Sequence, residues 1–122
     1  MAIPRYELYC LLFTGIDPNG KALRFCIPFE ELQSKRTIYI GRSGICAIRF
    51  DREYKEVSRL QACIRCWDLD YIYICNESEY NPTLVNGIPL YDKRLLEDGD
   101  ELTFGSITLT FNTVWHYQPA HF

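Results

Sequence analysis

Short apolar runs separated by turn residues are the feature that most constrains how this chain folds. The runs are rich in Ile, Tyr, Phe and Thr, which favour extended backbone, and Gly, Asn, Asp or Pro interrupts them at nearly regular intervals. We expect strands at Tyr6 to Phe13, Ala22 to Pro28, Thr37 to Ile40, Ala47 to Phe50, Ala62 to Trp67, Tyr71 to Asn76, Thr83 to Val85, Glu101 to Phe104 and Ile107 to Val114. The pattern predicts an all-β protein, a two-sheet antiparallel sandwich of about 10 to 11 short strands.

Chain length fits one small domain. With 122 residues, the chain can enclose a single hydrophobic core but not two. Only Phe29 to Gln33 can support a helical turn, and a segment this short needs tertiary packing to persist. We expect residues 1–114 to form the domain and residues 115–122, which carry no strand pattern, to form a C-terminal tail or to cover an edge of the sandwich.

Net charge and the N-terminal sequence indicate which partners and which cellular location to expect. The formal net charge of −3 argues against nonspecific binding to nucleic acid or to an anionic membrane, since such binding requires clustered Lys and Arg. The chain begins without the signal-peptide pattern of a basic end followed by an apolar stretch, so we expect an intracellular protein, in the nucleus or the cytoplasm. For the same reason, the glycosylation sequence Asn76-Glu77-Ser78 is not expected to be used.

The six cysteines indicate neither a disulfide framework nor a metal site. Five of them interrupt apolar strand-like runs, as reduced core cysteines do. Cys63 and Cys66 are three positions apart, but an extended segment turns such residues to opposite faces, and no second pair completes a zinc site. The sequence Asp98-Gly99-Asp100 is typical of a turn rather than of a pair of metal ligands. We therefore expect neither a metal nor a cofactor.

Two predicted loops carry side chains suited to an anion. Gly41 and Arg42 follow one strand, and Ser58 and Arg59 precede another. Because loops gather at the ends of a sandwich, the two guanidinium groups and the hydroxyl can meet around one ligand. A phosphomonoester carries a charge of about −1.5 to −2 and three acceptor oxygens, which match Arg, a hydroxyl and backbone amides. The alternative, from these residues alone, is that the arginines are solvated surface groups.

Five short motifs in order extend this interpretation. They are Gly41-Arg42-Ser43, Cys46-Ala47-Ile48, Val57-Ser58-Arg59-Leu60-Gln61, Asn81-Pro82-Thr83-Leu84-Val85-Asn86-Gly87, and Leu96-Glu97-Asp98-Gly99-Asp100 with Phe104-Gly105. With these motifs, the stretch from Thr37 to Phe111 resembles the forkhead-associated (FHA) domain, a phosphothreonine-binding β-sandwich of FHA/SMAD-like fold. The resemblance implies an adaptor that binds phosphothreonine on a partner protein.

The resemblance also implies roles for individual residues. Arg42 would bind the peptide backbone and the phosphate, Ser58 would contact the phosphate through its hydroxyl, and Arg59 would add a second cationic contact. Asn81 would hold the main chain of the ligand just after the phosphothreonine. Candidates for the rest of the pocket are Ser43, Glu79 and Tyr80, and candidates for its structural support are Gly41, Gln61, Asn86 and Gly87.

The chain departs from the family pattern at three places. Gln61 stands where the family usually has His, but Gln offers both a donor and an acceptor, and some TRAF-interacting FHA adaptors carry a similar Val-Ser-Arg-x-Gln. Glu79-Tyr80 replaces a common Ser-Thr, which removes a hydroxyl and adds a carboxylate near the phosphate. Pro82 replaces a flexible Gly, and the charged stretch Asp51 to Glu56 is slightly long.

These departures leave other functions open. Gln61, Glu79 and Tyr80 favour an FHA-fold scaffold subunit whose phosphate pocket has degenerated and which binds partners through other surfaces. A third hypothesis is phospho-dependent self-association, in which a phosphorylated segment of one copy docks on the next and forms a homo-oligomer. Catalysis ranks last, because both histidines, His116 and His121, lie in the predicted tail. We therefore expect phosphothreonine binding and no enzymatic activity.

Overall fold

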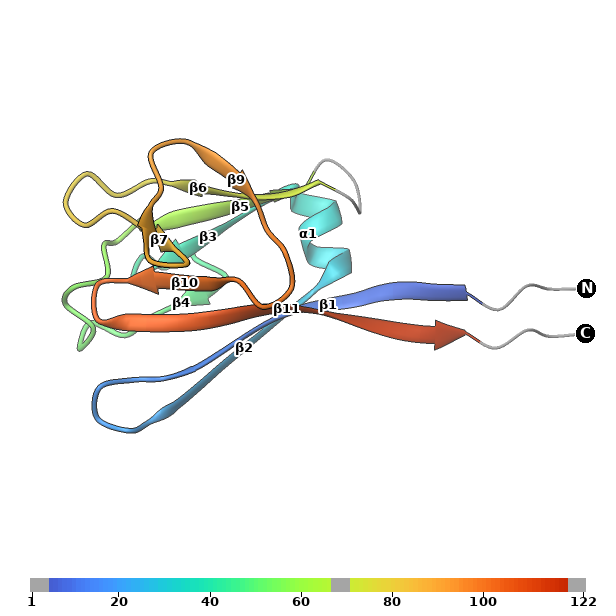
Figure 1. Cartoon of the computed structure of the whole chain (residues 1–122), viewed down its shortest axis with the longest axis horizontal. Helices are drawn as coiled ribbons and strands as arrows, with labels where there is room; N and C mark the ends of the chain where they lie inside the picture. The colour runs from blue at the N-terminus through green and yellow to red at the C-terminus, as the bar shows by residue number, and fades with distance from the viewer. Residues whose placement is uncertain (1–4, 67–70, 119–122) are drawn as a thin grey trace, which may run out of the picture.

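The computed structural model describes residues 5–66 and 71–118 and contains eleven strands and one short helix within them (Figure 1). The strands are β1 (Arg5–Ile16), β2 (Ala22–Pro28), β3 (Thr37–Gly41), β4 (Ile48–Arg49), β5 (Ala62–Cys66), β6 (Ile72–Asn76), β7 (Leu84–Val85), β8 (Ile88–Pro89), β9 (Lys93–Leu95), β10 (Glu101–Phe104) and β11 (Ile107–Gln118). The helix, α1 (Phe29–Lys35), lies between β2 and β3.

The strands form two sheets. One has six strands in the order β2-β1-β11-β10-β7-β8, and the other has five in the order β4-β3-β5-β6-β9. The predicted all-β sandwich is confirmed, and its pairs are antiparallel except for the parallel pair of β3 and β4. The sequence analysis missed β8 and β9, because Pro89 and the charged pair Lys93 and Arg94 give these short strands a weak β pattern.

The two longest strands, β1 and β11, pair antiparallel and continue beyond the sandwich as a two-stranded arm (Figure 1). Arg5 pairs with Gln118, so β11 runs four residues past its predicted end at Val114. Residues 115–118 of the expected tail therefore belong to β11, and residues 119–122 lie outside the described part of the chain. A two-stranded ribbon that lies outside the sandwich has no face against the core, so its residues need not alternate between apolar and polar. The strand predicted from the sequence therefore ends at Val114, although the strand itself continues.

The core lies between the sheets. Phe13, Phe50, Phe104 and Phe111 are almost completely buried, and aliphatic side chains from both sheets surround them. Each buried side chain of this size contributes about 1.5 to 3 kcal/mol of transfer free energy. Leu32 is also fully buried, so the short helix is held by tertiary packing as the sequence indicated.

The cysteines belong to this packing. All six are free thiols, and four of them are buried, whereas Cys26 is exposed. Cys63 lies opposite Cys75 in the pair of β5 and β6, and burial together with its hydrogen bond to Glu77 raises the pKa of Cys63 to about 12. In the part of the chain that the structure describes, no group of three His, Cys, Asp or Glu side chains is arranged to hold a metal ion. None of the helices found among these residues has the length and apolar character that spanning a membrane requires.

Candidate functional site

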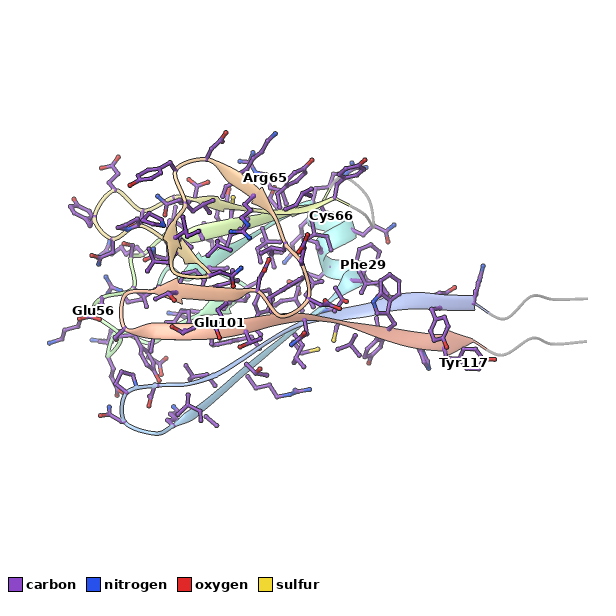
Figure 2. All side chains as sticks on the ribbon, in the orientation of Figure 1. Phe29, Glu56, Arg65, Cys66, Glu101 and Tyr117 are labelled. Carbon is purple, nitrogen blue, oxygen red and sulfur yellow. The ribbon has the colours of Figure 1, made fainter. Side chains whose placement is uncertain are left out.

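Three loops meet at the end of the sandwich opposite the β1–β11 arm (Figure 1). They are the β3–β4 loop (residues 42–47), the β4–β5 loop (residues 50–61) and the β6–β7 loop (residues 77–83). In Figure 2, Glu56 marks this end of the molecule and Tyr117 marks the arm. His116 lies on the arm and contacts Tyr9, so it is not among the residues of these loops. His121 lies outside the described residues.

Gly41 brings the first two loops into contact. A Cβ atom at this position would overlap the carbonyl oxygen of Arg59, so the close approach requires glycine. Immediately after it, the backbone N–H of Arg42 donates to the carbonyl of Ser58 at 3.2 Å, and that of Ser43 donates to the carbonyl of Arg59 at 3.0 Å. The backbones that carry both arginines and the serine are thereby fixed against each other.

Arg42 is aimed by a hydrogen bond of its own guanidinium group. Its Nε donates to the carbonyl oxygen of Val57 at 2.6 Å, and the side chain is half-buried. The terminal nitrogens Nη1 and Nη2 have no hydrogen-bond partner among the described residues. A guanidinium group carries five N–H donors in one plane, and the Nε–H of Arg42 is used by Val57. The N–H groups of Nη1 and Nη2 therefore remain available to an anionic ligand.

Ser58 faces a second serine that the sequence analysis did not assign to the site. The hydroxyl oxygens of Ser58 and Ser78 lie 2.7 Å apart. Ser78 Oγ also accepts the backbone N–H groups of Tyr80, at 3.3 Å, and of Asn81, at 3.1 Å. Either hydroxyl of the two serines can donate to the other, and when Ser78 donates, the O–H of Ser58 is available to a ligand.

Gln61 connects the β4–β5 loop with the β6–β7 loop. This side chain is fully buried. Its Oε1 accepts the backbone N–H of Ser58 at 2.9 Å, and its Nε2 donates to the carbonyl of Asn81 at 2.8 Å and to Thr83 Oγ1 at 3.2 Å. A single amide thus connects the loop of Ser58 with the loop of Asn81, using both its donor and its acceptor.

Asn81 and Asn86 hold different parts of the structure. Asn81 is exposed, and its Nδ2 donates to the carbonyl of Glu56 at 2.9 Å, which leaves its Oδ1 without a donor among the described residues. Asn86 and Gly87, with φ of 51° and 80°, form the turn between β7 and β8. Asn86 also donates to the buried Asp100 at 2.9 Å, so this turn belongs to the six-stranded sheet rather than to the loop cluster.

The loops enclose a cavity of about 460 Å³. It is lined by Arg42, Lys55, Ser58, Arg59, Leu60, Glu77, Ser78, Glu79, Tyr80 and Asn81. The structure thus brings together six of the seven residues predicted to touch the ligand, and Ser43 lines a neighbouring cavity instead. Sequence reasoning missed Lys55, Leu60, Glu77 and Ser78. The sequence Asn76-Glu77-Ser78 drew attention to Ser78, but it was interpreted only as a glycosylation sequence. In the structure, the side chain of Asn76 accepts the backbone N–H of Thr83 at 3.2 Å and shapes the loop.

The charged side chains around this cavity are three cations and two carboxylates. Arg42, Lys55 and Arg59 line the cavity together with Glu77 and Glu79. Glu77 accepts the Cys63 thiol at 3.3 Å, which holds its carboxylate towards β5. Glu79 is exposed, so water and salt screen its repulsion of a bound phosphate. The cavity therefore favours an anion.

We expect Ser78→Ala to lower affinity for the phosphothreonine peptide that the resemblance implies about threefold to tenfold, because Ser58 loses the hydrogen-bond partner of its hydroxyl and two backbone N–H groups lose their acceptor. Fluorescence anisotropy with a labelled peptide measures this change. Ser106→Ala, at an exposed turn, is the matched control. Equal affinity of the two variants would contradict the role given to Ser78.

A family model identifies this arrangement of loops. The model of the FHA domain matches residues 38–105, which is more than half of the 122-residue chain. The matched segment begins in β3 and ends directly after β10, so it contains all three loops of the cavity. No curated protein matches the chain.

Solved structures share the fold. The FHA domain of yeast Dun1, in complex with a doubly phosphorylated peptide derived from Rad53, is 24% identical with a TM-score of 0.68, and the match covers 93% of this chain and 81% of that one. The FHA domain of the Chlamydia trachomatis CT664 protein is 16% identical with a TM-score of 0.67 over 84% and 95% of the two chains. The N-terminal FHA domain of S. cerevisiae Rad53p, in complex with a phosphothreonine peptide, is 20% identical with a TM-score of 0.60 over 82% and 91%.

Proposed function

Because this chain belongs to the forkhead-associated (FHA) domain family, we propose that it binds a phosphothreonine peptide of a partner protein in the 460 Å³ cavity. FHA domains are binding modules, and we assign no catalytic step to the cavity. The observation that carries the proposal is the convergence of Arg42, Ser58 and Arg59 on one cavity, with two guanidinium nitrogens of Arg42 that no described residue occupies.

The chemistry of the donors fits a phosphate dianion. The outer nitrogens of Arg42 can bond two phosphate oxygens, and the Ser58 hydroxyl can donate to the third. Arg59 is exposed at the same cavity and supplies a second positive charge. A hydrogen bond to a charged group contributes roughly 1.5 to 3 kcal/mol, so two or three of them account for much of a micromolar affinity, about −8 kcal/mol.

Asn81 supplies the means to hold the peptide itself. Its Oδ1 is an acceptor at the exposed rim of the cavity, while its Nδ2 is held by the carbonyl of Glu56. An extended peptide that crosses the loops presents a backbone N–H to such an acceptor. The phosphothreonine peptides in the Dun1 and Rad53p complexes support this class of ligand.

The main rival hypothesis is a scaffold with a degenerated pocket. Gln61, one of the residues that favoured it, in fact bridges Ser58 to Asn81 through both ends of its amide. Glu79 is exposed at the rim, where its charge is screened. These contacts favour a pocket that keeps its geometry, and we therefore propose an adaptor that uses it, acting inside the cell in the nucleus or the cytoplasm.

A peptide library tests the proposal. We expect micromolar binding to peptides with a fixed phosphothreonine, and no binding to unphosphorylated peptides with the same flanking residues. A phosphoserine library measures the preference for the threonine methyl group. If Ser58→Ala keeps its melting temperature and every library member binds it as tightly as the wild type, or if none binds the wild type, the scaffold hypothesis is correct. Sedimentation that becomes concentration-dependent only after kinase treatment would identify a second copy as the partner.

A further inference from the structure

The arm formed by β1 and β11 leaves the sandwich at the end opposite the proposed phosphothreonine cavity (Figure 1). β2 pairs with β1 only from Cys10 to Ile16, and β10 pairs with β11 only from Ile107 to Thr110. In the described part of the chain, residues 5–9 and 115–118 therefore have no third strand beside them. A two-stranded ribbon is only marginally stable in water, and an open strand edge is a template for pairing with another chain.

One face of the arm continues the core-facing side of the six-stranded sheet. Phe111 is buried in the core, and alternate residues of a strand share a face, so Trp115 and Tyr117 lie on the same side of β11. Tyr6 pairs with Tyr117, and the centroids of the two rings are 5.2 Å apart. However, Tyr6 is 68% exposed, Trp115 45% and Tyr117 49%. This aromatic face thus extends past the part of the sheet that the core covers.

The opposite face of the arm carries charges in a self-complementary order. Arg5 and Glu7 alternate with Tyr6 along β1, and their exposed side chains form an ion pair at 2.9 Å. A second copy that runs antiparallel about Tyr6 places its Glu7 opposite Arg5 and its Arg5 opposite Glu7. Opposite charges that face each other across an antiparallel pair stabilise it, and like charges destabilise it. The outer part of β11, Trp115-His116-Tyr117, has no carboxylate and offers no such pairing.

Space for a further strand lies along this edge of β1. A cavity of about 810 Å³ adjoins the arm, and its lining includes Arg5, Glu7 and Tyr9 of β1 and Phe29, Glu30 and Gln33 of α1. β2 ends at Pro28, which pairs with Cys10, and the chain then continues into α1. In Figure 2, Phe29 lies beside the base of the arm. The position that β2 fills in the rest of the sheet is therefore open next to residues 5–9.

We infer that β1 of a second copy occupies this position, antiparallel to the first, with the two-fold axis at Tyr6. The two arms then form one four-stranded sheet in the order β11-β1-β1-β11. Each Arg5 faces Glu7 of the other copy, and the two Tyr6 rings join the aromatic faces of both arms. Such an isologous interface closes on itself, so the product is a dimer and not a fibre. Short edge strands bury a small area, so we expect the dimer to form at micromolar concentration.

This dimer requires no phosphorylation, because Arg5, Tyr6 and Glu7 lie outside the proposed phosphothreonine cavity. Each copy keeps its cavity at the end of the sandwich away from its own arm, so the two cavities lie at opposite ends of the dimer. The dimer differs in this respect from self-association through a phosphorylated segment. Together with the proposed function, it gives a bivalent adaptor, whose avidity for partners with two phosphothreonines exceeds the affinity of one cavity.

Sedimentation velocity of protein produced without kinase and treated with phosphatase measures the dimer. We expect the wild type to change from monomer to dimer across the micromolar range. Arg5→Glu and Glu7→Arg each place like charges opposite one another in both facing pairs, so each variant should raise the dimer dissociation constant about tenfold or more. Arg94→Glu makes the same change of charge as Arg5→Glu on β9, away from the arm, and should dimerise like the wild type.

An equimolar mixture of Arg5→Glu and Glu7→Arg is the decisive sample. In the mixed dimer, every facing pair again joins opposite charges, so we expect the mixture to dimerise although neither variant does so alone. The ion pair within each arm stays broken in both variants, so recovery comes only from contacts between copies. Recovery also shows that both variants are folded.

Three results would overturn the inference. A wild type that stays monomeric throughout the micromolar range would leave the arm to a different protein. Equal dimerisation of the wild type and both arm variants would place the interface elsewhere. Loss in both variants without recovery in the mixture would contradict the facing of Arg5 and Glu7. None of these measurements involves a phosphopeptide, so the proposed function is tested separately.

Discussion

Arg42→Ala is expected to lower the affinity for a phosphothreonine peptide by about a hundredfold or more. Two charge-assisted hydrogen bonds of roughly 1.5 to 3 kcal/mol each are lost, and a factor of one hundred corresponds to about 2.7 kcal/mol. The loss is large because the two outer nitrogens of Arg42 are the donors that the protein leaves open at the centre of the loop cluster. Isothermal titration calorimetry with a library-selected peptide measures it.

Two further variants serve as controls for Arg42→Ala. Arg42→Lys keeps the charge but loses the bond from Nε to the carbonyl of Val57 and the planar pair of donors, so we expect an intermediate affinity. Arg94→Ala removes an exposed arginine on β9 and should bind like the wild type. The Arg42 variants need thermal melting as well, since the Val57 bond is part of the folded loop. Wild-type affinity in a folded Arg42→Ala protein would contradict the site.

Gln61→Leu is expected to lower the free energy of unfolding by about 3 kcal/mol. Leucine fills a similar volume, but it leaves the backbone N–H of Ser58 and the carbonyl of Asn81 without their partner beneath the loops. The buried hydroxyl of Thr83 also loses the Gln61 amide, so three polar groups are affected. A buried polar group that loses its partner costs about 1 to 3 kcal/mol, and a half-buried or exposed group costs less. Urea unfolding followed by circular dichroism measures the change, and phosphopeptide affinity should fall with it because the two loops are no longer joined.

Gln61→His tests whether the two loops require the Gln amide itself or only one hydrogen-bond donor and one acceptor. Neutral imidazole has one donor and one acceptor, as the amide connection between the two loops requires. We therefore expect this variant to melt within a few degrees of the wild type and to bind phosphothreonine peptides. A loss as large as that of Gln61→Leu would show that the network accepts only the amide, and an unaffected Gln61→Leu would show that the bridge carries no stability.

Local pattern in the sequence was enough to predict most strands and the two arginine-bearing loops. Alternating apolar residues give the core strands their period, and the residues between them mark the turns. The pattern failed at the arm, where residues 115–118 extend β11 by pairing with β1. That pairing joins the two ends of the chain, and no local signal records it. β9 likewise becomes a strand through its pairing with β6, whereas β8 follows the local hairpin signal Asn86-Gly87, which the strand pattern of the sequence did not use.

The residue types suited to a phosphate were visible in the sequence by itself, because Arg and Ser at strand ends are a local property of the chain. Their convergence was decided by tertiary structure: Gly41 lets one loop contact another, Gln61 joins Ser58 to Asn81, and the hydroxyl of Ser78 is hydrogen-bonded to that of Ser58. Hydrogen bonds and close contacts between loops depend on distances of a few ångströms, which only the packed sheets determine.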